Sequence, residues 1–195
     1  MPFLTTHSGK HFCYKKISSE NIVIEDIAHA LSNICRFAGH LSSFYSVAQH
    51  SVYTSFLVPK SQALEALLHD ASEAYCVDIP APLKRLLPDY RRIENRVDAA
   101  IREKFMLPIS HDPQVKQADL IMLATERRDL GIDDGTPWPC LDTITPTDQF
   151  KIEPMPPKHA EIMFLARFSD LTSQADLQRI CDTYINELIA LAGRE

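Results

Sequence analysis

The sequence predicts an all-α fold, a bundle of about seven helices preceded by a small N-terminal β-hairpin. Apolar side chains recur every three or four residues over most of the chain, which is the spacing of a buried helix face. Only 5 of the 195 residues are glycine, fewer than a turn-rich β fold needs. The composition, 45% hydrophobic and 24% charged, is that of an ordinary globular protein. We therefore expect residues 1–195 to form one domain.

Residues 1–17 predict the hairpin, because two short β-prone runs flank the turn Ser8-Gly9-Lys10. His7 and His11 lie beside that turn with no acidic residue near them. We interpret them as a polar strand face and not as metal ligands.

The remaining elements follow from periodicity and from residues typical of helix ends. The expected helices span residues 18–39, 43–57, 61–75, 89–105, 112–130, 156–168 and 173–192. Residues 78–87 predict a proline-rich turn with a short helix. Residues 131–157 predict an irregular proline-rich loop that holds the single tryptophan, Trp138. A loop this long is typical of a functional or disordered segment, and we expect an active-site wall or a dimer contact.

Composition excludes several classes of function. A net charge of −6 argues against broad nucleic-acid binding, which needs a basic surface. No apolar run reaches the roughly 18 residues of a membrane span, and residues 1–16 lack the apolar core of a signal peptide. The five cysteines form no CxxC pair, which favours reduced thiols. We expect a cytoplasmic protein without a membrane segment and without stable nucleic-acid binding.

The stretch Ala66-Leu67-Leu68-His69-Asp70-Ala71-Ser72-Glu73 carries the strongest chemical signal. On a continuous helix Glu73 lies one turn from His69 and Asp70, so the three side chains share a face. An adjacent His-Asp pair in an apolar helix is costly to bury unless something binds it, and a divalent cation would do so. The alternative is a neutral histidine hydrogen-bonded to its neighbour at a helix surface.

Two further helices extend this pattern. His50 lies on the preceding helix, and Asp119 begins an apolar run on a later one. The order His, His-Asp, Asp resembles that of the HD-domain metal-dependent phosphohydrolases. The segments Cys35-Arg36-Phe37-Ala38-Gly39-His40 and Asp78-Ile79-Pro80-Ala81-Pro82-Leu83-Lys84-Arg85 resemble those of the bacterial 5'-deoxynucleotidase group and of related phage dATP triphosphohydrolases. The resemblance covers roughly residues 20 to 130 and implies an HD-domain helical bundle.

The resemblance also implies a set of site residues. His50, His69, Asp70 and Asp119 would bind one divalent cation, which would be Co, Mn, Mg, Zn or Fe. Arg36, Phe37 and His40 would line the substrate site, and Lys84 and Arg85 would attract the phosphates. Relatives often have tryptophan at the position of Phe37, which leaves the preferred base open.

Local alternatives exist for several of these residues. Arg36 also fits a surface arginine that compensates a helix dipole, and Lys84 and Arg85 also fit a solvated face. Glu126 lies two turns from Asp119, which would allow a place near the cleft, but we expect it to form a salt bridge at its helix end.

The implied chemistry is hydrolysis at phosphorus. Four protein ligands leave two positions open at an octahedral cation for water and a phosphate oxygen. Glu73 would orient that water or take its proton, and Asp78 is the second candidate for proton transfer.

We expect a phosphohydrolase of 2'-deoxynucleotides, either a 5'-deoxynucleotidase or a dNTP triphosphohydrolase, that acts as a homodimer. One alternative is another HD activity, such as hydrolysis of an alarmone or a cyclic nucleotide. Alarmone hydrolases usually carry an acidic pair one turn after the His-Asp, whereas Glu73 is followed here by Ala74. A second alternative is a non-catalytic helical interaction protein with a vestigial metal site.

Overall fold

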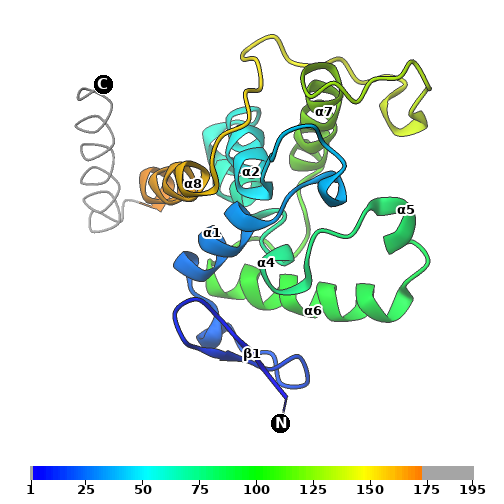
Figure 1. The fold of residues 1–195 in the computed structure, drawn as a ribbon. Helices are drawn as coiled ribbons and strands as arrows, with labels where there is room; N and C mark the ends of the chain where they lie inside the picture. The colour runs from blue at the N-terminus through cyan, green and yellow to red at the C-terminus, as the bar shows by residue number, and fades with distance from the viewer. Residues whose placement is uncertain (1, 173–195) are drawn as a thin grey trace, which may run out of the picture.

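The computed structural model describes residues 2–172, which are mostly helical with a small antiparallel hairpin near the N-terminus (Figure 1). The α-helices of this part are α1 Ile24–Asn33, α2 Val47–Phe56, α3 Ala63–Leu68, α4 Glu73–Cys76, α5 Ala81–Lys84, α6 Pro88–Lys104, α7 Pro113–Asp129 and α8 Pro157–Thr172. Short 3-10 helices span Ser19–Asn21, Phe37–Gly39, Lys60–Gln62 and Pro139–Leu141. The predicted all-α character and the hairpin are confirmed. The helix expected at 173–192 lies outside the described residues. No described helix is long and apolar enough to cross a membrane.

The hairpin is attached to the helices at its turn and through one aromatic side chain. Strand β1 Leu4–Thr5 pairs with β2 His11–Phe12, and Gly9 in the turn between them has a φ of +82°. Asp26 of α1 accepts hydrogen bonds from the amide and the hydroxyl of Ser8 at 2.6 and 2.8 Å. Phe12 is buried and stacks on Tyr75 of α4 with ring centroids 4.3 Å apart.

Helix α2 lies at the centre of the helical part, where α1, α3, α7 and α8 pack around it (Figure 1). Its start is capped by Ser46, whose hydroxyl accepts the amide of Gln49 at 3.1 Å. The main core joins buried side chains of α1, α2, α3 and α8, such as Ile27, Val52, Leu67 and Phe164. Because α2 is buried on nearly all sides, its His50 lies in the interior of the molecule.

The first expected helix is shorter than predicted. Helix α1 ends at Asn33, whereas the periodicity predicts continuation to residue 39. The chain then becomes extended, because Cys35 forms a bridge with Ser46 and the amide of Arg36 donates to the Tyr45 carbonyl at 2.9 Å. Arg36 therefore belongs to a strand-like segment, and the prediction that it ends a helix is wrong.

The helix expected at 61–75 is also interrupted. Residues 69–72, which include the His-Asp pair, form turns between α3 and α4. In a continuous α-helix the Ala66 carbonyl would accept the amide of residue 70. Here Nδ1 of His69 donates to that carbonyl at 2.7 Å, so a side chain takes the place of a backbone donor. The tighter bonds from Ala71 to Leu68 and from Glu73 to Asp70 continue the turn.

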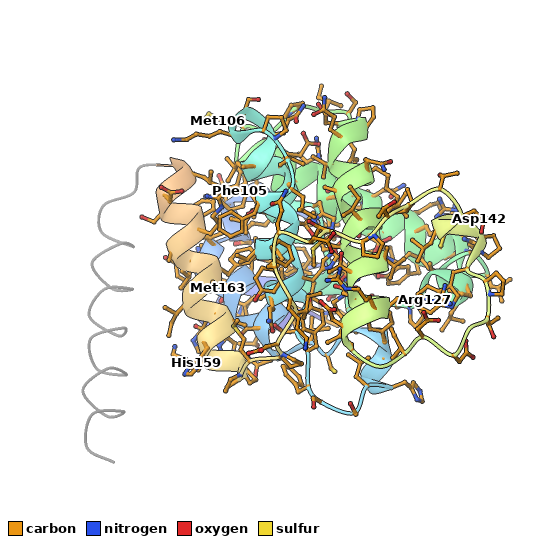
Figure 2. All side chains as sticks on the ribbon, turned by 90° about the horizontal axis from the view of Figure 1, so that it is seen from above. Phe105, Met106, Arg127, Asp142, His159 and Met163 are labelled. Atoms are coloured by element: carbon orange, nitrogen blue, oxygen red, sulfur yellow. The ribbon has the colours of Figure 1, made fainter. Side chains whose placement is uncertain are left out.

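The irregular segment at 131–157 is confirmed, and it is fastened to α7. Arg127 donates to the carboxylate of Asp133 at 3.1 Å and to the Thr136 carbonyl at 2.8 Å. Asp129 accepts the Ile152 amide at 2.8 Å. In Figure 2, Arg127 lies on the side of the molecule that carries this segment and Asp142, and α8 with His159 and Met163 lies at the opposite side. These bonds hold the segment to α7, and its part as an active-site wall or dimer contact stays a prediction.

Candidate metal centre

Two imidazole rings meet with their Nε2 atoms toward one another. Nδ1 of His69 donates to the Ala66 carbonyl at 2.7 Å, and Nδ1 of His50 lies 2.6 Å from Oε1 of Glu126. Because a carbonyl and a carboxylate only accept, both Nδ1 atoms carry a proton, and Nε2 of each neutral ring holds a lone pair. The two Nε2 atoms are 3.3 Å apart. When both rings are neutral, two lone pairs at that distance repel unless a proton or a metal cation lies between them.

Two carboxylates complete a cluster of acceptors. Oδ1 of Asp119 is 3.3 Å from Nε2 of His50 and 3.8 Å from that of His69. Oδ2 of Asp70 is 3.6 and 3.2 Å from the same two atoms. One ligand atom from each of three residues, His50, His69 and Asp119, lies within 4.8 Å of the other two. Asp70 is not part of this group of three, but its carboxylate also contacts both imidazole rings. The four residues come from α2, the turn after α3, and α7.

These distances fit a cation after a small contraction. Bonds of about 2.1 Å place neighbouring ligand atoms about 3.0 Å apart at octahedral angles and about 3.4 Å apart at tetrahedral angles. Two carboxylates also balance the charge of one divalent cation. The candidate ligands differ in exposure. The His50 side chain is fully buried, whereas the side chains of Asp70 and Asp119 are 21% and 22% exposed. A substrate would therefore approach past the carboxylates.

The same electrostatics favour positive charge on both imidazoles. Burial, the largest influence on His69, lowers its pKa, but the carboxylates of Asp70 and Asp119 outweigh it and leave the pKa well above the ordinary value. Burial and Arg36 lower the pKa of His50, yet Glu126 and Asp119 leave it raised. Burial opposes ionisation of Asp119, but hydrogen bonds from the two histidines hold its pKa well below the usual range. The cluster thus attracts either a proton or a metal cation.

Glu126 is the residue that sequence reasoning missed. It is fully buried on α7, where the sequence favoured a salt bridge at the helix end. Its Oε1 accepts from His50, and its Oε2 accepts from NH2 of Arg36 at 3.0 Å. Burial raises the pKa of Glu126, but the charges of Arg36 and His50 outweigh it and leave the pKa lowered. Glu126 therefore stays ionised beneath the candidate ligands.

Arg36 is held in this buried network. Its guanidinium lies between Glu126 and Asp70, with NH1 3.6 Å from Oδ2 of Asp70, and only 11% of the side chain is exposed. The alternative of a surface arginine at a helix end is therefore wrong. Its Nε is buried and has no hydrogen-bond partner.

Glu73, a candidate for proton transfer, is buried beside Lys84. Its Oε1 lies 3.6 Å from Nζ of Lys84, and its Oε2 is buried without a hydrogen-bond partner. Burial raises the pKa of Glu73 well above its usual range, and the negative charges of Asp70 and Asp78 raise it further. Lys84 also pairs with Glu94 at 2.7 Å, so it is not a free surface cation.

Asp78, the second candidate, is half-buried in the segment after α4. Burial raises the pKa of Asp78, and Asp70 adds to the effect. The positive charges of Arg36, Lys84 and His50 act in the opposite direction and lower the pKa of the same carboxyl group.

The other expected substrate residues lie farther out. Phe37 is half-buried against the cluster of Tyr45, Met122, Leu130 and Ile152, and the guanidinium carbon of Arg36 lies 5.5 Å from the centre of its ring. Phe37, Ala38 and Gly39 have consecutive φ values of +55°, +51° and +79°, a left-handed turn that costs energy at the two residues with a Cβ. His40 and Arg85 are exposed, and neither forms part of the acceptor cluster.

Comparison with known proteins assigns the chain to a family. No family model matches it. It is 64% identical over 172 residues to the uncharacterized protein YfdR of Escherichia coli K12, covering 88% of this chain and 97% of that protein. It is 34% identical over 121 residues to an uncharacterized protein of Rhodobacter capsulatus, covering 57% of this chain and 62% of that protein. The protein therefore belongs to the family of Escherichia coli YfdR.

Proposed function

We propose that this protein is a metal-dependent phosphohydrolase that cleaves phosphate from 2'-deoxynucleotides. The observation that carries the proposal is the convergence of two imidazole Nε2 atoms and two carboxylates from three separate elements. His50, His69, Asp70 and Asp119 would hold the cation. The His, His-Asp, Asp order resembles that of HD-domain phosphohydrolases, which supports hydrolysis over other uses of a cation.

When bound, a divalent cation activates water as a nucleophile and withdraws charge from a phosphoryl group. The residues around it supply the other parts of the reaction. The guanidinium of Arg36, which lies beside Asp70 and is 11% exposed, would attract a phosphate oxygen. Lys84 is half-buried between two carboxylates and adds positive charge on the side of Glu73. Glu73 and Asp78 are the candidates for moving a proton to the leaving oxygen or from the attacking water.

The choice of deoxynucleotides rests on the resemblance and on Phe37. A flat ring next to Arg36 would lie against the sugar or base of a nucleotide whose phosphate meets the guanidinium. Little room then remains for a 2'-hydroxyl. A pocket of this kind rejects one added hydroxyl by on the order of a hundredfold. The proposal includes a cytoplasmic homodimer, which light scattering of the purified protein would test in part.

A substrate screen tests the proposal. Purified protein is incubated with each deoxy- and ribonucleoside mono- and triphosphate in the presence of Mg, Mn or Co, and the released phosphate or triphosphate is identified. We expect release from deoxynucleotides and a much slower reaction with ribonucleotides. Asp70→Ala should abolish turnover together with cation binding, and Arg36→Ala should lower turnover and leave the cation bound. Hydrolysis of an alarmone or cyclic nucleotide alone would favour another HD activity, and a protein without any cation affinity would indicate a vestigial site.

A further inference from the structure

Glu126 contacts both His50 and Arg36 at hydrogen-bond distance. One carboxylate oxygen lies 2.6 Å from Nδ1 of His50 and the other lies 3.0 Å from NH2 of Arg36. Both oxygens are buried, since Glu126 has no exposed surface. The Glu126 side chain thus joins a candidate cation ligand, His50, to the buried Arg36.

Only a carboxylate satisfies both partners. Nδ1 of His50 must donate if Nε2 is to keep its lone pair for a cation, and Arg36 can only donate. Glutamine has the same shape but one acceptor and one donor end. If its oxygen faced His50, its amide hydrogens would oppose those of Arg36. If its oxygen faced Arg36, its amide group would donate to Nδ1, and the proton of a neutral His50 would move to Nε2.

We propose that Glu126 is a positioning residue that makes Nε2 of His50 the cation-binding nitrogen. Arg36 sets the requirement for a carboxylate at this position, because it needs an acceptor from the same side chain. The inference rests on the cation of the proposed function. Metal-bound histidines commonly donate their second nitrogen to a carboxylate, and loss of that partner weakens metal affinity about 10- to 100-fold. The new element is the dependence on Arg36, because its guanidinium decides which way a glutamine at position 126 turns.

A double-mutant cycle measured by cation affinity tests this dependence. Full-length wild-type protein and the Glu126→Gln, Arg36→Met and doubly substituted variants are stripped with chelator, and Mn²⁺ affinity is measured by calorimetry. Glu126→Gln should weaken binding about 10- to 100-fold. Arg36→Met removes a positive charge 3.6 Å from Asp70 and should leave affinity unchanged or tighter. In the Arg36→Met background the glutamine oxygen is free to face His50. Adding Glu126→Gln to that variant should therefore lower Mn²⁺ affinity by less than about threefold.

Glu65→Gln is a matched control. Glu65 is also a buried glutamate paired with an arginine, Arg102 at 2.8 Å, but its partners are none of the candidate ligands. This variant should lose stability and keep wild-type Mn²⁺ affinity. The proposal would be overturned if Glu126→Gln lowered Mn²⁺ affinity equally in wild type and in Arg36→Met, or lowered it in neither. If the single variant does not fold, the doubly substituted protein still tests it, because it should fold and bind Mn²⁺ as Arg36→Met does.

A second measurement does not need the cation. Nitrogen-15 NMR of histidine-labelled protein, above the pH at which the imidazoles titrate, identifies the protonated ring nitrogen of His50. Wild type should show Nδ1–H, and Glu126→Gln should show Nε2–H. An unchanged tautomer contradicts the positioning role. A wild-type protein that shows the expected tautomer and binds no cation would contradict the proposed function alone.

Discussion

Asp119→Asn should remove most of the stabilisation that a divalent cation gives to the folded protein. A ligand at 100 times its Kd stabilises the native state by about 2.7 kcal/mol. For a chain of this size each kcal/mol shifts Tm by about 2–4 °C, so wild type should gain about 5–10 °C. Asp119 supplies one of two carboxylates, with its Oδ1 3.3 Å from Nε2 of His50. Its loss should weaken binding at least about 100-fold, which leaves about 0.4 kcal/mol and a shift near 1 °C.

The assay is thermal unfolding followed by circular dichroism, after removal of metal with chelator and addition of Mn, Co, Zn, Mg or Fe. Lys116→Gln is the control, because Lys116 is 67% exposed and pairs with the other oxygen of Asp119 at 2.7 Å without being a ligand. This variant should keep the full shift. An Asp119→Asn protein that gains as much as wild type would refute the assignment of Asp119. A wild-type protein that gains nothing from any of the five metals would refute the site.

Three further predictions concern stability. Val77 has a φ of +70° and is 57% exposed, so Val77→Gly should relieve strain and raise the free energy of unfolding in urea by about 1 kcal/mol; an unchanged or lower value would contradict this. Arg102→Met leaves Glu65 with a buried unpaired charge and should cost about 3–5 kcal/mol in the same assay. The hydrogen bond from Arg128, with the Ile152 amide, lowers the pKa of Asp129 below its usual 3.8, so this carboxylate stabilises the fold above that pH. Asp129→Asn should cost about 1 kcal/mol at pH 7, and the difference from wild type should shrink as pH falls below about 4.

The long helices were predictable because their signals are local. Asp112-Pro113 and Pro88-Asp89 place proline at the start of α7 and α6, and apolar residues recur at helical spacing after them. The expected spans, 89–105 and 112–130, differ from the observed ones by one residue at each end.

Two predicted helix ends were wrong because they depend on tertiary and side-chain contacts, which the spacing of apolar residues does not reveal. The bridge from Cys35 to Ser46 ends the first helix early, and this pairing joins residues 11 positions apart, beyond the spacing of three or four residues that defines a helix face. The third helix is interrupted where the His69 side chain donates to the Ala66 carbonyl. The spacing of apolar residues does not predict this hydrogen bond. The turn it creates alters the expected face shared by His69, Asp70 and Glu73, yet the His-Asp pair still meets His50.

Glu126 shows where a stronger sequence argument was available. The buried face of α7 runs through Val115, Ala118 and Met122, at steps of three and four residues, and the next step reaches Thr125 and Glu126. A glutamate on an apolar stripe must find a buried partner, because an unpaired carboxylate there is too costly. The neighbouring arginines suggested a local salt bridge, but both turn outward to the irregular segment. The partner therefore had to come from another element. Among the candidate residues of the neighbouring helix and the segment before it, His50 and Arg36 are those that need a buried acceptor.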